Sequence, residues 1–402
     1  MSARIPLFSS ARHPARDASI GCAVVLAVAL GVGRFAFTPL LPMMLASGAI
    51  DIRHGGWLAS LNYAGYFIGA VTCAAISHDH AKVVRAGLAT TVVLTFAMGL
   101  TDAFWLWAAV RFVAGAVSAW TFVFASQWGL RRLGELGAHQ WSGVIYTGPG
   151  VGIVVTGLLA AAAGPLGADA AWIGFAVLSA VAGAFVWRTF ANDPCARRCA
   201  VPTEREAAAL SIAAPPAKHR AQALWLAVLY GLPGFGYIIT ATFLPVIARA
   251  ALPGSPWPDL FWPVFGAALI PGALIASQLP LAWDNRALLA GCYLLQAVGI
   301  ALGIVFPTTA GFALGSLLIG LPFTAITLFA MREARRLRGE RAAGLMGYAT
   351  AAYGVGQIAG PLVAAPVAAH TGSFSIALWL AVAALVAGSA GLAWVAARYR
   401  IG

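Results

Sequence analysis

The chain has 402 residues, of which 61% are hydrophobic and only 9% are charged, and its formal net charge is +12. Soluble domains carry roughly 25% charged residues, so this composition excludes a soluble globular protein and indicates an integral membrane protein. The basic residues form no stripe interleaved with aromatic residues, so we expect no nucleic-acid partner.

Windows of about 20 apolar residues predict twelve membrane-spanning helices in two groups of six. The first six are expected near 18–46, 56–77, 86–101, 103–128, 141–163 and 171–190. The last six are expected near 222–249, 260–280, 287–306, 309–331, 342–368 and 373–397. We therefore predict an all-α membrane protein with an N-terminal tail (1–17), a first bundle (18–190), a polar linker (191–221) and a second bundle (222–402).

The distribution of basic residues predicts the orientation. If both termini are cytoplasmic, 21 basic residues lie in cytoplasmic segments, and Arg53 and Arg249 lie outside. This asymmetry follows the positive-inside rule, so we expect cytoplasmic termini. Arg is far commoner than Lys, and Ala and Gly are abundant, which we interpret as the bias of a GC-rich bacterial coding sequence. We therefore expect a multi-pass protein of the bacterial inner membrane, acting as a monomer in the lipid bilayer.

The cysteines indicate neither a metal site nor a cofactor. Cys22, Cys73 and Cys292 lie in predicted spans, where small hydrophobic thiols are ordinary. Cys195 and Cys199 lie in the linker, and no histidine completes a metal-binding set there. No cofactor and no metal are therefore expected.

Arg34 and Arg111 stand out among the 38 charged residues (25 basic and 13 acidic), because they alone fall inside the long apolar stretches. A charge at the bilayer centre costs at least about 2.5–3.5 kcal/mol, so one that remains there is a functional candidate. Arg34 lies roughly 20 Å and Arg111 roughly 12 Å from the outer ends of their helices, so both could open into one cavity. We predict that they bind an anionic or strongly polar substrate. The alternative is that each arginine bonds backbone carbonyls of a neighbouring helix.

Uncharged polar residues extend this predicted substrate site. Asn62, Tyr63 and Tyr66 occupy about one helical turn and share a face. The other expected buried groups with hydrogen-bonding tips are Gln127, Tyr146, Tyr237, Tyr353 and Gln357. For each of them the alternative is a helix–helix hydrogen bond or an aromatic anchor at the membrane interface.

The two halves of the chain repeat. At an offset of 203 residues, Gly31-x-Gly33 matches Gly234-x-Gly236 and Gly69 matches Gly272. At an offset of 205, Arg111-x3-Gly115 matches Ser316-x3-Gly320. At an offset of 212, Gly148-Pro149 matches Gly360-Pro361. Parallel repeats of this kind indicate a transporter whose site lies between two bundles near the midplane. The paired Gly148-Pro149 and Gly360-Pro361 are predicted hinges, since proline removes a helical hydrogen bond.

Several motifs resemble the major facilitator superfamily over essentially the whole chain. Arg111-Phe-Val-Ala-Gly115 resembles its motif B, and Gly148-Pro-Gly-Val-Gly152 resembles its motif C. Gly31-Val-Gly-Arg34-Phe-Ala-Phe-Thr-Pro-Leu-Leu-Pro42 and Ala59-Ser-Leu-Asn62-Tyr63-Ala-Gly65-Tyr66 are similar to the YbfB/YjiJ branch. The loop at Ser77–Arg85 departs from the superfamily pattern. Asp79 and Arg85 are predicted to form a cytoplasmic gate latch there, and a solvated loop without a gating role is the alternative.

The resemblance implies a secondary transporter, and export of a small organic anion or amphipathic compound is the leading prediction. Uptake of a carboxylate or sugar-like nutrient is the second, and multidrug export is a further possibility. A non-transporting sensor or scaffold of the same fold is the alternative from another class, and no enzyme is expected. Because no Asp, Glu or His is expected inside the membrane, a proton would travel with the substrate or on a boundary carboxylate such as Asp102; otherwise the protein exchanges anions or carries a passive flux.

Overall fold

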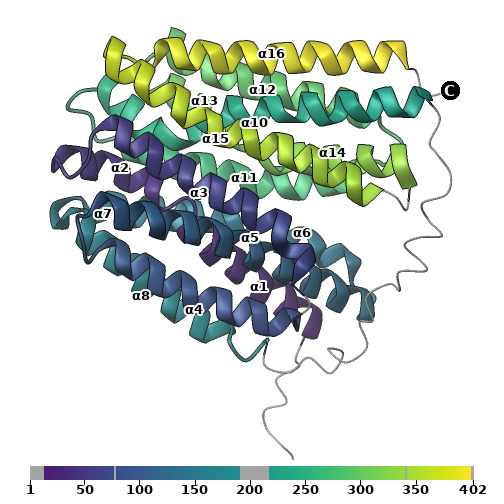
Figure 1. Ribbon diagram of the computed structural model, residues 1–402, viewed down its shortest axis with the longest axis horizontal. Helices are drawn as coiled ribbons and strands as arrows, with labels where there is room; N and C mark the ends of the chain where they lie inside the picture. Colours follow the sequence, from purple (N-terminus) through teal and green to yellow (C-terminus); the bar gives the residue numbers. More distant parts are fainter. Residues whose placement is uncertain (1–12, 77, 191–216, 340–341, 400–402) are drawn as a thin grey trace, which may run out of the picture.

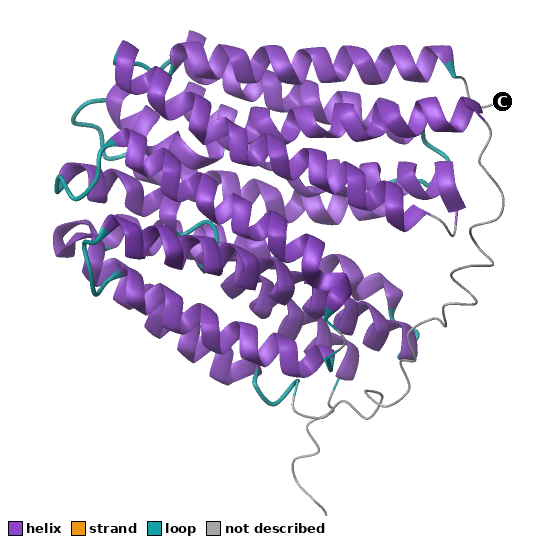
Figure 2. Cartoon of the chain, viewed as in Figure 1, coloured by secondary structure: helices purple, strands orange, loops and turns teal. Residues whose placement is uncertain are grey.

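The computed structural model describes residues 13–76, 78–190, 217–339 and 342–399. All regular secondary structure in these residues is helical (Figures 1 and 2). The described residues before 191 are called the first half below, and those after 216 the second half. Most of the predicted tail and linker, including Cys195 and Cys199, lies outside the described residues.

The first membrane helix has three parts. It begins as α1 (Pro14–Leu26), continues as a π-helix over Ala27–Val32 and resumes after a turn as α2 (Phe37–Ala46). The rest of the first half comprises α3 (Ile52–Thr72), α4 (His80–Met98), α5 (Phe104–Glu135), α6 (Ser142–Ile145), α7 (Gly148–Ala162) and α8 (Gly167–Val186), with 3-10 turns at Cys73–Ala75, His139–Trp141 and Gly164–Leu166.

The second half begins with a long helix, α10 (Ala217–Ala251), which carries two internal prolines. It continues with a 3-10 turn at Pro258–Leu260, α11 (Phe261–Gln278), α12 (Asn285–Val305), α13 (Thr309–Gly320), α14 (Phe323–Arg338), α15 (Ala342–Thr371) and α16 (Ser375–Arg398).

Eleven helical stretches of the described residues are long and apolar enough to cross a membrane. The helix α3 is not among them, because Ser60, Asn62, two tyrosines and several glycines lower its hydropathy. It packs against α5 and α15 inside the molecule. The prediction of an all-helical, multi-pass membrane protein is confirmed.

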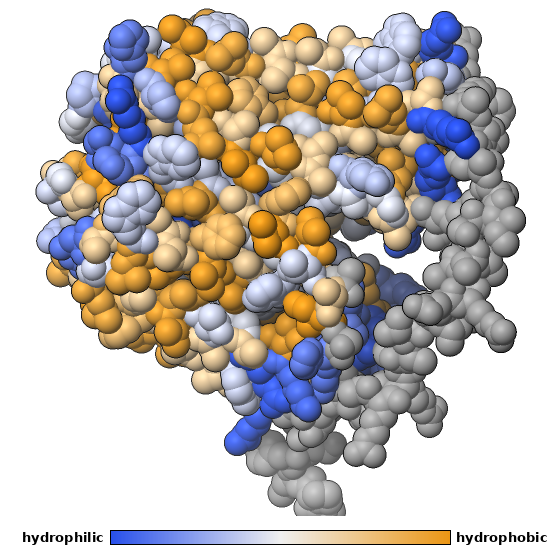
Figure 3. Space-filling model, in the orientation of Figure 1, coloured by the Kyte–Doolittle hydropathy of each residue, from blue (hydrophilic) through white to orange (hydrophobic). Residues whose placement is uncertain are grey.

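The two halves lie side by side. In Figure 1, α1 to α8 gather in the lower part of the molecule and α10 to α16 in the upper part. They meet through α3 with α15, α7 with α11 and α2 with α10. We call the end that carries Pro14 and Arg398 the terminal end, and the end that carries the turn between α2 and α3 the distal end. On the face shown in Figure 3, apolar side chains cover the middle and hydrophilic ones gather at both ends.

Glycines bring equivalent helices together in both halves. A Cβ at Gly69 would meet the carbonyl oxygen of Ala116 on α5 at 2.6 Å, and one at Gly115 would collide with the carbonyl oxygen of Asn62. At the matching positions, Cβ atoms at Gly272 and Gly320 would collide with backbone carbonyls of the neighbouring helix. The repeat in the sequence therefore corresponds to a repeated close contact between helices, which small residues permit.

Candidate substrate-binding site

Arg34 lies in the turn that interrupts the first membrane helix. Before this turn the helix changes register: the amide of Gly33 donates to the carbonyl of Val28 at 3.0 Å, and that of Phe35 donates to Leu30 at 2.9 Å. These are bonds to the fifth preceding residue, in place of the fourth. A π-helical segment of this kind is frequent at functional sites.

Two side chains from neighbouring helices hold the backbone at this turn. The Nδ2 of Asn62 on α3 donates to the carbonyl oxygens of Gly33 (3.3 Å) and Arg111 (2.9 Å). The Nη2 of Arg111 on α5 donates to the carbonyl oxygen of Arg34 at 3.2 Å. Gly65 and Gly115 allow α3 and α5 to come close enough for these bonds. Three helices therefore meet at the backbone of Gly33 and Arg34.

The Arg34 guanidinium is enclosed by aromatic rings and not by acids. Its central carbon lies 4.2 Å from the ring centre of Tyr66 and 5.1 Å from those of Tyr63 and Phe35. Cation–π contacts of this kind compensate part of the cost of burying the charge. The residue is 5% exposed, and its Nε and Nη2 are buried without a hydrogen-bond partner. These two nitrogens form one edge of the guanidinium, the edge that receives a carboxylate in a bidentate pair.

Arg111 is bonded differently. It is 2% exposed, it packs over the ring of Phe37 at 4.8 Å, and its Nη2 is engaged by the Arg34 carbonyl. Its Nε is buried and without a partner. This geometry matches the alternative interpretation of the sequence, in which the arginine bonds a backbone carbonyl of a neighbouring helix.

A small cavity beside Arg111 has an equivalent in the second half. Six residues that line the first cavity have counterparts 205 positions later that line the second: Leu94, Thr95, Met98, Val110, Arg111 and Ala114 correspond to Gly299, Ile300, Gly303, Gly315, Ser316 and Ile319. The two halves thus place Arg111 and Ser316 at equivalent points. The buried charge at this point belongs to the first half alone.

The second half contributes an aromatic cluster. The ring of Tyr353 stacks on those of Tyr230 (4.8 Å between centres) and Tyr237 (6.0 Å). The polar tips are engaged within the protein: Tyr230 donates to the Oγ1 of Thr327 at 3.1 Å, and the Nε2 of Gln357 donates to the hydroxyl of Tyr237 at 2.5 Å. The structure therefore brings Tyr237, Tyr353 and Gln357 together.

A chain of rings connects this cluster to Arg34. Phe35, next to Arg34, lies 6.0 Å from Trp262 and 6.2 Å from Phe323 between ring centres. Phe323 in turn lies 5.2 Å from Tyr237. A continuous series of ring contacts between the halves therefore links the aromatic cluster to the neighbour of Arg34.

Hydrogen bonds join the halves around and beyond this site, toward the distal end. Thr38 donates to the carbonyl of Ala241 and Ser60 to that of Ile358, both at 2.9 Å, and the hydroxyl groups of Tyr63 and Thr242 lie 2.9 Å apart. Thr38 and Ala241 are 203 residues apart, which is the offset of the repeat, so the axis that relates the halves passes near this bond. Toward the terminal end, the surface is hollowed between the halves (Figure 3).

Four predicted site residues lie elsewhere, near the terminal end of the first half. Gln127 is exposed and not buried as expected, because it extends to His80, whose Nε2 lies 2.9 Å from its Oε1. Tyr146 packs against Phe122 at 6.4 Å between ring centres. Asp79 caps α4 through the amide of Ala81, and Arg85 lies over the ring of Trp187 at 5.7 Å. The contacts described for these four residues do not reach Arg34.

The predicted hinge positions differ between the halves. Gly148 and Pro149 begin α7, directly after the break that follows α6. Gly360 and Pro361 lie inside the continuous helix α15. A Cβ at either glycine would collide with a neighbouring helix, at Ala23 and Ile238 respectively.

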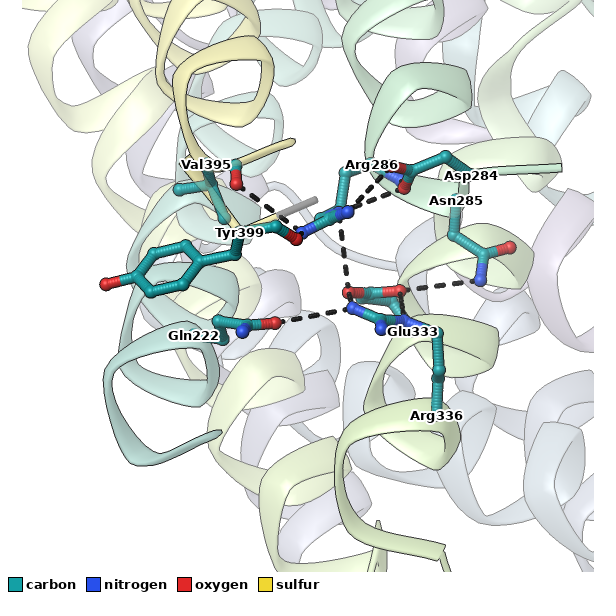
Figure 4. Close-up of polar contacts among 8 residues, drawn as sticks. All are labelled: Gln222, Asp284, Asn285, Arg286, Glu333, Arg336, Val395 and Tyr399. Atoms are coloured by element: carbon teal, nitrogen blue, oxygen red, sulfur yellow. Dashed lines mark hydrogen bonds and ion pairs between the residues drawn. The ribbon is translucent and has the colours of Figure 1, made fainter. Parts of the chain in front are cut away.

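A buried ionic cluster that the sequence did not predict lies at the terminal end of the second half (Figure 4). Glu333 was expected in a polar connection, but α14 continues to Arg338 and carries this carboxylate into the protein, where it is 1% exposed. It pairs with Arg336 at 2.5 Å and lies 3.9 Å from the Nε of Arg286. The spacing of three residues between Glu333 and Arg336, one helical turn, was the signal that could have indicated it.

Arg286 ties this cluster to other helices. It is 2% exposed, forms a bidentate pair with Asp284 and donates through Nη1 to the carbonyl of Tyr399 at 3.0 Å. Partial burial would raise the pKa of the Asp284 carboxyl, but hydrogen bonds from the side chain and backbone of Arg286 lower that pKa below its ordinary value. The cluster therefore binds the ends of α12, α14 and α16 together.

Comparisons with known proteins agree with this architecture. A family model described as "Uncharacterised MFS-type transporter YbfB" matches residues 26–392. A crystal structure of a mutant of the nucleoside transporter NupG has a TM-score of 0.75 at 14% identity, covering 94% of this chain and 99% of that one. A second NupG structure has a TM-score of 0.68 at 13% identity, covering 97% and 100%.

At such identities the likeness to solved structures shows a shared fold alone. No curated protein matches the sequence. The family model, in contrast, covers most of the chain and marks the protein as a transporter and not an enzyme. The chain belongs to the YbfB-type transporter family of the major facilitator superfamily.

Proposed function

We propose that this secondary transporter exports a small organic anion across the bacterial inner membrane by alternating access, with Arg34 as the anion-binding group. The observation that carries the proposal is the free edge of the Arg34 guanidinium, buried between the halves with two unpaired N–H donors. A buried donor without a partner costs about 1–3 kcal/mol, and more when it is charged. An anionic substrate would remove that cost.

We assign different roles to the neighbours of Arg34. Asn62 and Arg111 position it, because their side chains bond the backbone on which it is carried. Tyr63, Tyr66, Tyr237, Tyr353 and Gln357 line the site. Gln127 and Tyr146 line the path to the terminal end, and Asp79 and Arg85 flank that path.

We further propose that the terminal end is cytoplasmic and that α3 is the twelfth membrane helix, so that each half is a six-helix bundle. Arg85, Arg132, Arg220, Arg335 and Arg398 all lie near the terminal end, which fits the positive-inside rule. In this orientation the bonds of Thr38, Ser60 and Tyr63 to the second half close the external side. Export requires these bonds to break while the cytoplasmic hollow closes, with Gly148-Pro149 and Gly360-Pro361 as the bending points.

Coupling to an ion is proposed to involve the substrate itself. The charged neighbour of Arg34 is Arg111, and the described contacts of Arg34 include no carboxylate or histidine. Glu333 lies between two arginines in the ionic cluster and is not a free proton carrier. A proton would therefore leave with the substrate or on a boundary carboxylate such as Asp102, or a second anion would be exchanged.

Uptake of a sugar-like nutrient is the second candidate. The solved structures of similar fold carry the name of a nucleoside transporter, which favours a neutral solute with hydroxyl groups. The buried charge of Arg34 favours an anion, and we rank transport of an anion first for that reason.

Metabolite profiling of the native bacterium with and without this protein tests the proposal. Export predicts that an organic anion accumulates inside cells that lack the protein and declines in their medium. The opposite distribution, or a change confined to neutral solutes, would contradict it. A strain that expresses the Arg34→Ala variant at the same membrane level is the matched control, and it should resemble the strain without the protein.

A further inference from the structure

We infer that the transported anion is an aromatic carboxylate, a flat ring that carries a carboxyl group. This inference rests on the proposed function and narrows it from organic anions in general to one chemical class. Three features of the site carry it: the shape of the free donor edge, the ring faces around it and the engagement of the neighbouring hydroxyl groups.

The free donor edge fits a carboxylate. The Nε and Nη2 of Arg34 point the same way from a planar guanidinium, and their two N–H groups match the two oxygens of a carboxylate. Tyr66 covers the face of the guanidinium and leaves this edge as its unsatisfied part. A planar anionic group held along the edge keeps the cation–π contact intact.

The ring faces fit a flat, unsaturated substrate. Tyr230, Tyr237 and Tyr353 lie nearly parallel, with angles of 23° and 21° between neighbouring planes. Tyr353 and Tyr66 are each half-buried, while Tyr230 and Tyr237 are buried. Tyr353 and Tyr66, one from each half, are therefore the less buried tyrosines beside Arg34 and the stack. Aromatic rings prefer to pack on such surfaces in offset-stacked or edge-to-face arrangements.

The polar tips near the stack argue against a polyhydroxylated substrate. The hydroxyl of Tyr230 bonds Thr327, and that of Tyr237 accepts from Gln357. A sugar would have to break these bonds to find partners for its own hydroxyl groups, whereas an aromatic ring leaves them in place. Phe35, Phe323 and Trp262 extend the aromatic wall from Arg34 toward the stack.

A matched pair of acids tests the inference. Benzoate and cyclohexanecarboxylate have the same charge and similar size and differ in the aromaticity of the ring. Purified protein in proteoliposomes should transport benzoate about two- to twelvefold more efficiently, which is the range expected for one aromatic pair. Equal transport of the two acids, or preference for the saturated ring, would overturn the inference and leave anion transport standing.

Variants of Tyr353 test whether the preference for benzoate depends on the stacked tyrosine rings. Tyr353→Leu should lose most of the preference for benzoate, and Tyr353→Phe should keep it, since the ring and not the hydroxyl is responsible. Tyr348→Leu is the control on the same helix, because Tyr348 is 75% exposed. If Tyr353→Leu kept the preference for benzoate, the stacked rings would not be its cause. If Tyr353→Leu folded poorly, the comparison of benzoate with cyclohexanecarboxylate on the unaltered protein would still decide the inference.

A neutral probe separates failure of this inference from failure of the proposed function. Benzamide has the ring of benzoate without its charge. If the protein carried benzamide as well as benzoate, and Arg34→Ala left both rates unchanged, the proposed recognition of an anion by Arg34 would be contradicted. Transport of aliphatic carboxylates without benzoate would contradict only the aromatic class.

Discussion

Arg111 donates a hydrogen bond from its Nη2 to the backbone carbonyl of Arg34, across 77 positions of sequence and at 3.2 Å. Arg111's own carbonyl accepts a bond from Asn62, which also bonds Gly33. The two buried arginines are therefore linked through backbone groups and not through a shared acid. One arginine fixes the position from which the other presents its free edge.

Replacing Asn62 by alanine tests this link. The substitution leaves the buried carbonyls of Gly33 and Arg111 without their side-chain partner, at a cost of about 1–3 kcal/mol. We expect weaker substrate affinity, seen as a higher KM with a smaller change in maximal rate, and a lower unfolding temperature in detergent. Ser179→Ala is the control, because Ser179 is equally buried but bonds only within α8. If both variants lost stability alone, with KM unchanged, the positioning role would be disproved.

Gly65 sets the distance between α3 and α5. A Cβ there would collide with the carbonyl oxygen of Phe112, so Gly65→Ala should push the helices apart and cost at least about 1–3 kcal/mol. Gly174→Ala on α8 meets nothing within 4 Å, and should be neutral or slightly stabilising because alanine favours a helix. Thermal unfolding of both variants in the same detergent compares them. Equal stabilities would contradict the close packing of α3 and α5.

The ionic cluster should be a strong stabilising element of the second half. Glu333→Gln removes the buried carboxylate that pairs with the partly exposed Arg336 and lies 3.9 Å from the buried Arg286, and removal of one partner of a buried pair typically costs about 3–5 kcal/mol. Glu135→Gln is the matched control at the surface, where the pair with Arg132 is worth about 0–1 kcal/mol. We expect the unfolding temperature to fall much further for the first variant. Similar small losses in both would show that the cluster contributes little.

Asp284 should make stability depend on pH at acid values. Because its folded pKa is lower than its ordinary value of about 3.9, its contribution is fully present above that value and is lost as pH falls through the folded pKa. Asp284→Asn should therefore lower stability near neutral pH and flatten the acid dependence below about pH 4. Unfolding temperatures of both proteins across that range test this expectation. Parallel pH curves would mean that Asp284 has no linked proton.

Much of the fold could be predicted from the sequence, because lipid exposure requires long apolar helices and glycines mark close helix contacts. Arg34 and Arg111 stood out for the same reason, since charges are rare in such segments. The offset between Arg111 and Ser316 also reappears in the two equivalent cavities.

The features that could not be predicted depend on backbone bonding and on contacts between distant residues, which the hydropathy of a sequence window does not contain. The π-helix before Arg34 is a change of hydrogen-bond register within an apolar run. Hydropathy depends only on residue type, so it does not reveal such a change. Glu333 lies in a polar stretch of sequence, and its burial follows from partners more than 40 residues away, such as Arg286. Gln127 faces out because His80, from another helix, offers it a partner.

Transport by Arg34 variants in proteoliposomes, measured with an organic anion that the unaltered protein carries, tests most directly whether this guanidinium binds the substrate. Arg34→Ala should abolish anion transport, Arg34→Lys should retain a small fraction because a point charge lacks the bidentate edge, and Arg53→Ala, outside the site, should behave like the unaltered protein. All three must remain folded in detergent. Full anion transport by folded Arg34→Ala would show that this guanidinium does not bind the substrate.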